Sequence, residues 1–273
     1  MDNRVLERIV IVILLLLNLA LAAVVLSDRA ETRRSNREIT EYVLRVLQDN
    51  NIRAAEGAVR VQEAPKRVTL ARNDQRESEI ARQLLGSAEP QELGGKIMFY
   101  RTDKGQAVFR GSGDVETLYT SSAVPIRGSA VKTTLRLLRQ AGIDAALTGP
   151  VAEESPMVEV YCLWNDYPVY NAVLQFDYSG DSLYMITGNR VFDSMTGEEG
   201  TGLMNSTSAL LRFVELVKQD GLICSRLDAV QPGYLQTVVV SGESTLSPVW
   251  RIETDIGVFL INAENGVMET GTA

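Results

Sequence analysis

The sequence contains no histidine and only two cysteines among its 273 residues. Histidine is the commonest general base in enzymes and the commonest transition-metal ligand, so many kinds of catalytic and metal centre are excluded. Cys162 and Cys224 allow at most one disulfide. Cys162 alternates with Val158, Val160 and Trp164. That alternation favours a buried free thiol at Cys162 over a bridge.

Basic residues are scarce relative to acidic ones. The chain carries 27 Lys and Arg against 35 Asp and Glu, a formal net charge of −8. The imbalance lies in residues 83–273, which hold 13 basic and 23 acidic side chains. Such a surface repels phosphate backbones and anionic lipid, so we expect no nucleic-acid partner.

Motifs that carry chemistry are also few. There is no glycine-rich phosphate loop and no spaced cluster of metal ligands. Ser129 and Lys132 match S-x-x-K, but the companion motifs S-D-N and K-T-G are missing, so we interpret Ser129 as a helix cap. The acidic pairs Glu153-Glu154 and Glu198-Glu199 fall in loop-like, solvated stretches. We therefore predict no catalytic residue, cofactor or metal, and a protein that is not an enzyme.

One long apolar run is present at the N-terminus. Residues 9–26 (IVIVILLLLNLALAAVVL) are eighteen residues without a charge. A helix of this length covers roughly 27 Å, close to the hydrocarbon thickness of a bilayer. We predict a transmembrane anchor, with a tail at 1–8 and a polar stalk at 27–36. A cleaved signal peptide is the alternative, because arginines precede the run and Ala20-Leu21-Ala22 resembles a cleavage site.

The orientation of this anchor is predicted from the size of the domain on its C-terminal side. Arg4 and Arg8 before the span are outnumbered by four arginines after it, which by charge alone favours the opposite topology. A large domain after a span is translocated largely regardless of its charge. We therefore expect a single-pass protein of the cell membrane with a cytoplasmic N-terminus and the bulk of the chain extracytoplasmic.

Two places are candidates for partner binding. Asn18 is the one polar residue of the apolar run, and Leu14 and Ala22 lie one helical turn to either side of it. An amide in hydrocarbon seeks a hydrogen bond across helices, and a small residue permits close approach. Trp250, on a strand-like stretch, is predicted to be a core or an interface residue.

The outer part is predicted to be an α+β protein. Residues 37–122 are assigned to an N-terminal α+β domain, with a helix that ends at Asn50-Asn51 and a hairpin over 96–110. Residues 123–200 and 201–273 form two further units that echo each other. Two predicted helix ends, at Gly142 and Gly221, lie 79 residues apart. The pairs Pro168-Val169 and Pro248-Val249 lie 80 residues apart.

This recurrence predicts a helix packed across an antiparallel sheet, used twice. Chance repetition of common turn residues is the alternative. On the duplication hypothesis, both prolines open equivalent strands, and Trp250 is buried between its hairpin and the helix around residues 211–214.

The C-terminal stretch 247–266 (SPVWRIETDIGVFLINAENG) resembles the hairpin of PepSY-like domains. Together with Leu17-Asn18-Leu19, the helix end at 47–52 (LQDNNI) and Leu84-Leu85-Gly86, it makes the chain resemble the YycI family, and less closely the related YycH. The resemblance covers nearly the whole chain. It implies an extracytoplasmic α+β protein held by one N-terminal transmembrane helix.

The resemblance also implies a function in signal transduction. Members of this family work with a sister protein to adjust the sensor kinase WalK of a two-component system. The expected partners are therefore a WalK-like membrane sensor histidine kinase, a YycH-like sister protein, and the lipid bilayer through residues 9–26. We expect regulation by protein-protein contacts of the anchor and the outer domain. The alternative is a PepSY-type inhibitor or chaperone of a surface peptidase.

Overall fold

The computed structural model describes residues 14, 18, 21, 27, 31–87, 89–152, 155–239 and 242–269. Within them lie a helix over residues 31–49 and three further helices, α2 (Asp74–Leu85), α3 (Ala130–Ala141) and α4 (Ser206–Gln219). The strands are β1 (Arg53–Ala54), β2 (Arg67–Ala71), β3 (Gln91–Glu92), β4 (Met98–Thr102), β5 (Gly105–Phe109), β6 (Asp114–Tyr119), β7 (Ala145–Leu147), β8 (Met157–Trp164), β9 (Tyr167–Ser179), β10 (Ser182–Asn189), β11 (Ser194–Glu199), β12 (Arg226–Val238), β13 (Glu243–Thr254), β14 (Gly257–Asn262) and β15 (Met268–Glu269). The predicted α+β class is confirmed.

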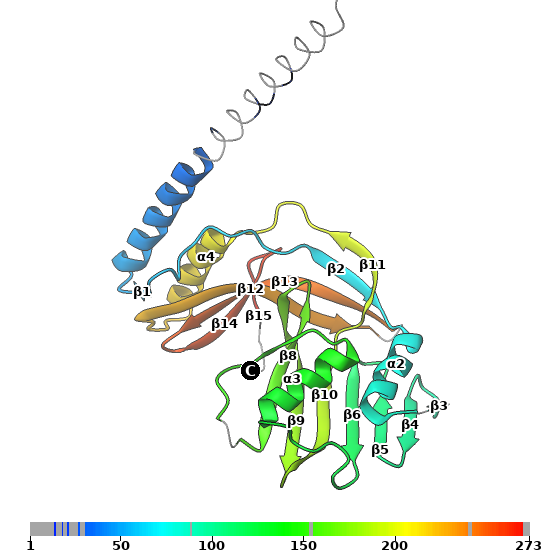
Figure 1. Ribbon diagram of the computed structural model, residues 1–273. Helices are drawn as coiled ribbons and strands as arrows, with labels where there is room; N and C mark the ends of the chain where they lie inside the picture. The colour runs from blue at the N-terminus through cyan, green and yellow to red at the C-terminus, as the bar shows by residue number, and fades with distance from the viewer. Residues whose placement is uncertain are drawn as a thin grey trace, which may run out of the picture.

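The first sheet is antiparallel and has the order β3-β4-β5-β6-β10-β9-β8-β7. Helices α2 and α3 lie across one face of it (Figure 1). Apolar residues of α3 recur at helical spacing, and this face is buried with Leu137 and Leu138 at its centre. They join α2 residues and the strand residues Tyr100, Phe109 and Phe176 in the largest core.

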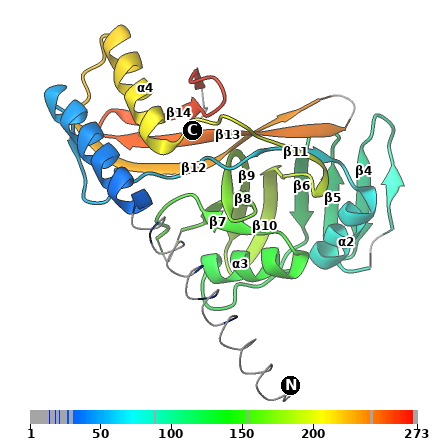
Figure 2. The ribbon, with the colours of Figure 1, turned by 90° about the horizontal axis from the view of Figure 1, so that it is seen from above.

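The second sheet contains β11, β2, β13 and β12 in that order, with β14 beside β13 and β1 parallel to β12. Helix 31–49 and α4 cover one face of it, as the view from above shows (Figure 2). Val43 and Leu47 of helix 31–49 pack with Leu210 and Phe213 of α4 in a second core. The two sheets are therefore each covered by their own pair of helices.

The two sheets meet where β12 passes β9. The parallel pairing there is limited to Tyr234 and Val169. At this point β12 carries Pro232-Gly233, and a Cβ on Gly233 would lie 2.4 Å from the Tyr170 ring and 2.6 Å from the carbonyl oxygen of Pro168. The glycine is therefore required by the close approach of β9.

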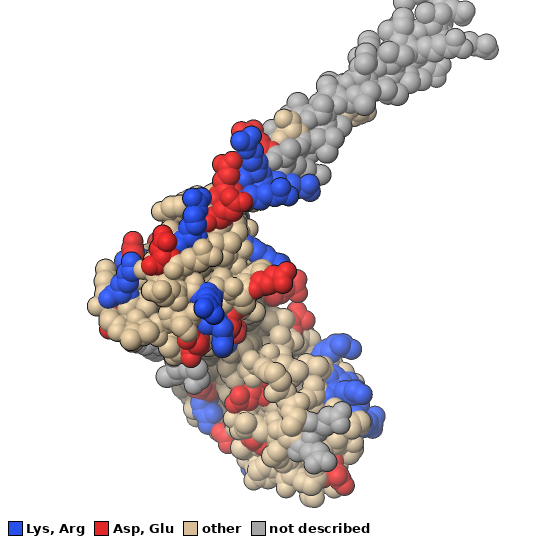
Figure 3. Space-filling view, turned by 90° about the vertical axis from the view of Figure 1, so that its left-hand side faces the viewer, with Lys and Arg blue, Asp and Glu red and all other residues tan. Residues whose placement is uncertain are grey.

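Helix 31–49 begins within the stretch predicted as a polar stalk, residues 27–36. Residues 31–36 are helical, and Arg34 Nε lies 3.1 Å from Glu38 Oε1, one turn along the helix. No glycine or proline interrupts this stretch, and basic and acidic side chains are interspersed along it (Figure 3). The predicted end is confirmed, because Asn51 adopts a left-handed conformation with φ of 61°.

The predicted anchor lies outside the described residues, apart from Leu14, Asn18 and Leu21, which are helical. In the part of the chain that the structure describes, no helix combines the length and the apolar character needed to cross a membrane. Both cysteines are buried and neither forms a disulfide.

The domain boundaries predicted at 122 and 200 do not separate the two sheets. Within residues 37–122, β2 pairs with β11 and β13 of the second sheet, whereas β3 to β6 belong to the first. Strand pairing between residues far apart in sequence decides this division, and local composition carries no trace of it.

Two units nevertheless share one arrangement. The first unit is α3 followed by the meander β8-β9-β10, and the second unit is α4 followed by β12-β13-β14. Pro168 is the second residue of β9, but Pro248 is the sixth of β13, so the two prolines do not open equivalent strands. β13 begins earlier because its first residues pair with β2, as far as Leu246. Pro248 follows the β2 pairing and precedes the first β14 pair, at Val249, where a missing N–H is tolerated.

Candidate functional site

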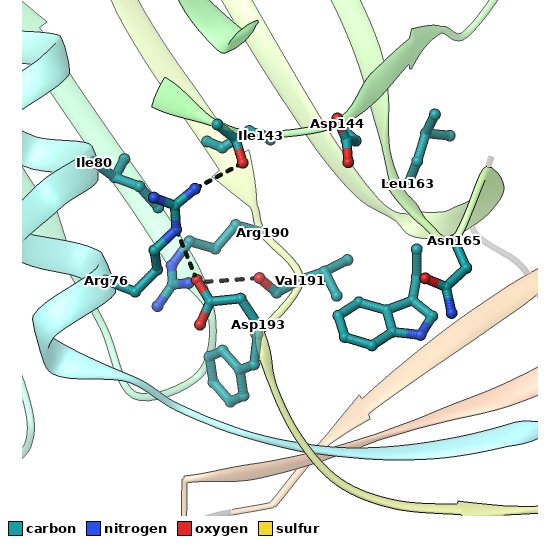
Figure 4. Close-up of a pocket in the computed structure, with 12 residues that line it drawn as sticks. Arg76, Ile80, Ile143, Asp144, Leu163, Asn165, Arg190, Val191 and Asp193 are labelled. Atoms are coloured by element: carbon teal, nitrogen blue, oxygen red, sulfur yellow. Dashed lines mark hydrogen bonds and ion pairs between the residues drawn. The ribbon is translucent and has the colours of Figure 1, made fainter. Parts of the chain in front are cut away.

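A hollow of about 170 Å³ lies beside the junction of the two sheets (Figure 4). Four segments line it: the start of α2, the end of α3, the β8–β9 turn and the crossover from β10 to β11. Its walls combine apolar and charged side chains, namely Arg76, Ile80, Gly142, Ile143, Asp144, Leu163, Trp164, Asn165, Arg190, Val191, Phe192 and Asp193.

Arg76 connects three of these segments. The α2 N-cap, Asn73, accepts from the backbone N–H of Arg76 and fixes the first turn of the helix. The Arg76 side chain reaches away from α2. Its Nη2 donates to the carbonyl oxygens of Ala141 and Gly142 at 3.1 and 2.8 Å, and its Nε lies 3.4 Å from Asp193 Oδ2. A cation thus sits where the α3 dipole is negative.

Gly142 makes this contact possible. It is the C-cap of α3 and adopts the left-handed conformation with φ of 66°, which a residue with a Cβ occupies at a cost. A Cβ at this position would lie 2.3 Å from Arg76 Nη2. The helix end and the arginine therefore require the same glycine.

Beneath the hollow lies a buried triad formed by Arg72, Glu77 and Arg190. Glu77 is 0% exposed and receives a bidentate pair from Arg72, with Nε at 2.8 Å and Nη2 at 2.7 Å. Arg190 Nη2 donates to the same carboxylate, and the Arg190 guanidinium stacks near the rings of Phe109 and Phe192. Hydrogen bonding to Glu77 raises the pKa of Arg72. The triad joins the β2–α2 connection, α2 and the crossover.

Only some of the polar groups in the walls of the hollow are accessible to a ligand. The Nε of Arg190 and the indole Nε1 of Trp164 have no hydrogen-bond partner among the described residues, but both atoms are buried. Arg76 and Asp193 are about 30% exposed and face the hollow in Figure 4. Burial raises the pKa of the Asp193 carboxyl, and the nearby Arg190 and Arg76 charges oppose that rise.

This arrangement suits binding. The volume equals roughly six waters of bulk liquid, which is the size of one amino-acid side chain. Ile143, Leu163 and Val191 supply apolar contact, and the Arg76–Asp193 pair supplies one donor and one acceptor group at the rim. A small amphipathic group fits such a site better than a purely apolar or a multiply charged one.

The structure places the predicted partner-binding residues in different surroundings. Leu14 and Asn18 are helical and exposed, and Ala22 lies outside the described residues. Trp250 is 0% exposed, packs with Ala209 of α4 and Ala263, and donates from its indole Nε1 to the carbonyl oxygen of Met204 at 2.7 Å. Its side chain offers no contact surface, so Trp250 is a core residue and not a partner contact.

Other sequence candidates have structural roles where they are described. Ser129 caps α3, accepting at Oγ from the backbone N–H of Lys132 at 3.2 Å, as predicted. Glu198 is in the edge strand β11 and pairs with Lys66. Glu153 and Glu154 lie outside the described residues. Burial raises the pKa of the Cys162 thiol to about 11.

Sequence reasoning missed the hollow and the triad. Arg76 and Gly142 meet across 66 residues, a contact without any local pattern. One signal was present for the triad. Glu77 occupies the apolar face of α2, one turn before Ile80 and Ala81, and a carboxylate on a buried helix face requires cationic partners.

No protein-family model matches the sequence, and a search of curated proteins finds no relative. Among solved structures, an uncharacterized protein from Eubacterium rectale ATCC 33656 is similar with a TM-score of 0.48 and 8% identity, over 81% of this chain and 90% of that one. YycH from Bacillus subtilis is similar with a TM-score of 0.41 and 10% identity, over 74% of this chain and 56% of that one. The chain thus spans little more than half of the YycH chain.

Proposed function

We propose that the chain is a membrane-anchored extracytoplasmic regulator of a two-component sensor kinase, without enzymatic activity of its own. It acts through protein-protein contacts of its N-terminal helix and its outer α+β part. The partners proposed are a WalK-like kinase and a YycH-like sister protein. The sequence resemblance to the YycI family supplies this proposal.

The observation that carries the proposal is the way helix 31–49 is built into the second unit. Val43 and Leu47 are each 1% exposed and share a core with Leu210 and Phe213 of α4. The helix therefore cannot shift or rotate without disturbing α4 and the sheet beneath it. In this proposal a displacement of the anchor, or of the outer part, is passed on through helix 31–49, which forms a rigid connection to α4 and the second sheet.

The alternative function is inhibition or folding assistance of a surface peptidase. An inhibitor needs its anchor only to stay near the membrane, and a flexible linker serves that purpose. The continuous helix over residues 31–49, stabilised by the Arg34–Glu38 pair, favours the regulator.

An experiment that changes the stiffness of helix 31–49 distinguishes the two functions. Four glycines inserted between Thr32 and Arg33 break the connection and leave Val43 and Leu47 in place. We expect this variant to be exported and to co-purify with the kinase after crosslinking. In proteoliposomes it should no longer change the autophosphorylation of that kinase.

A helical insertion of seven residues, EAAAKEA, at the same position is the matched control. It adds two turns and nearly preserves the rotational phase, so regulation should persist. Kinase regulation that survives the glycine insertion at full strength contradicts the rigid connection. Recovery of a peptidase that both variants inhibit equally, without a kinase, supports the alternative function.

A further inference from the structure

The outward face of α3 carries a basic stripe. Lys132, Arg136 and Arg139 are spaced four and three residues apart, so they lie within about 60° of one another around the helix axis. Lys132 and Arg139 are exposed and Arg136 is half-buried, while the opposite face of the helix packs into the core. None of the three forms an ion pair with any acidic residue that the structure describes.

Each of the other helices has at least one basic side chain paired with an acidic residue of the same helix. Arg34 pairs with Glu38 at 3.1 Å, Arg76 with Glu79 at 3.0 Å, and Arg212 with Glu215 at 3.0 Å. Helix α3 contains no acidic residue at all. The chain as a whole has an excess of acidic side chains, but α3 contributes none of them to its outward face.

Lys132 and Arg136 are placed unfavourably for α3 itself. Lys132 lies in the first turn, where the helix dipole disfavours a positive charge. Lys132 and Arg136 are like charges one turn apart, which repel. Charges that are placed against the helix dipole and against each other, without a compensating contact, are expected at functional positions.

The chemistry of the stripe indicates its ligand. Two of its three members are arginines, whose planar guanidinium groups bind carboxylates in a bidentate manner. The stripe is only about 10 Å long, the rise of seven helical residues. A long polyanion or a membrane surface would extend beyond it and meet the acidic remainder of a chain with net charge −8.

We propose that this face of α3, defined by Lys132, Arg136 and Arg139, is a docking surface for a short acidic segment of a partner protein. The proposal does not depend on kinase regulation, because any acidic protein segment of this size satisfies it. It assigns the outer part a contact separate from the anchor.

The test measures binding of a fluorescein-labelled peptide of eight glutamates to the full chain in neutral detergent micelles. We expect binding that weakens steeply with salt. The variant Lys132→Gln/Arg136→Gln/Arg139→Gln should bind about tenfold more weakly, as the loss of three exposed ion pairs implies. The matched control Arg34→Gln/Arg212→Gln/Lys218→Gln removes the same charge from other helices and should bind like the unmodified chain.

Four outcomes overturn the proposal. Equal weakening in both variants means that only net charge matters. Polyphosphate that competes better than the glutamate peptide, or stripe-dependent binding to phosphatidylglycerol vesicles, reassigns the surface to another anion. Peptide binding that appears only in Glu153→Gln/Glu154→Gln shows that the chain's own acids occupy the stripe. Intact circular dichroism of the stripe variant is required for each comparison.

Discussion

The two units place a helix on a three-stranded meander, but the neighbouring helix is held in different ways. In the second unit, helix 31–49 and α4 share an apolar core, which we call the apolar joint, formed by Val43, Leu47, Leu210 and Phe213. In the first unit, α3 shares an apolar core with its neighbour α2 and also contacts it through a charged side chain. Arg76 of α2 covers the last carbonyls of α3, and we call this contact with Gly142 the charged joint.

The two joints should differ in which substitutions they tolerate. An apolar joint accepts many shapes of similar volume, because burial is not directional. A charged joint requires donors and acceptors at fixed positions, and an unmatched partner is costly. The first unit should therefore be sensitive to small changes of geometry, and the second mainly to loss of volume.

The largest effect is expected in the second unit. Trp250 is fully buried between β13 and α4, so Trp250→Ala should lower the free energy of unfolding by about 3–5 kcal/mol. Trp250→Phe keeps most of the volume but loses the bond to Met204, and should cost clearly less. Denaturant unfolding of the full chain in detergent, followed by far-UV circular dichroism, measures both. An unchanged midpoint for Trp250→Ala would contradict its position in the core.

An effect of similar size is expected from the triad beneath the hollow. Glu77→Ala leaves Arg72 and Arg190 buried without their shared carboxylate and should cost about 3–5 kcal/mol. Glu79→Ala, two residues along the same helix, removes a half-exposed partner of Arg76 and should cost about 0–1 kcal/mol. Equal costs for the two variants would show that the buried triad contributes no more to stability than a half-exposed ion pair.

Helices were the part of this fold that the sequence predicted best. The helix ends predicted at Gly142 and Gly221 lie at the ends of α3 and α4, and the left-handed Asn51 and the Ser129 cap are as predicted. The stretch predicted as a polar stalk is helical over residues 31–36, because a polar composition does not by itself exclude a helix. One exposed ion pair, between Arg34 and Glu38, and the lack of glycine and proline favour a helix there.

Strands were predicted less completely, for reasons that lie outside local sequence. The middle of β12 contains Pro232-Gly233, which by local rules ends a strand, yet these residues sit where β9 crosses. β11 is polar and exists because β2 pairs with it. The hollow likewise depends on Arg76 meeting residues of α3 far away in sequence.

The smallest difference between two matched variants is expected at the helix ends, where the two units can be compared directly. Gly142 ends α3 with φ of 66°, and Gly221 follows the end of α4 with φ of 65°. Replacing either by alanine carries the same backbone cost of about 1–2 kcal/mol for a left-handed residue. A Cβ on Gly221 meets nothing within 4 Å, whereas one on Gly142 meets Arg76 at 2.3 Å.

Gly142→Ala should therefore cost more than Gly221→Ala by about 1–3 kcal/mol, the worth of hydrogen bonds from a charged donor. The excess arises because the new methyl group displaces Arg76 from the Ala141 and Gly142 carbonyls. In an Arg76→Ala background the difference between the two glycine variants should vanish, which a double-mutant cycle measures. An excess that persists without Arg76 would mean that the α3 end is strained for another reason, and that the charged joint is not what distinguishes the first unit from the second.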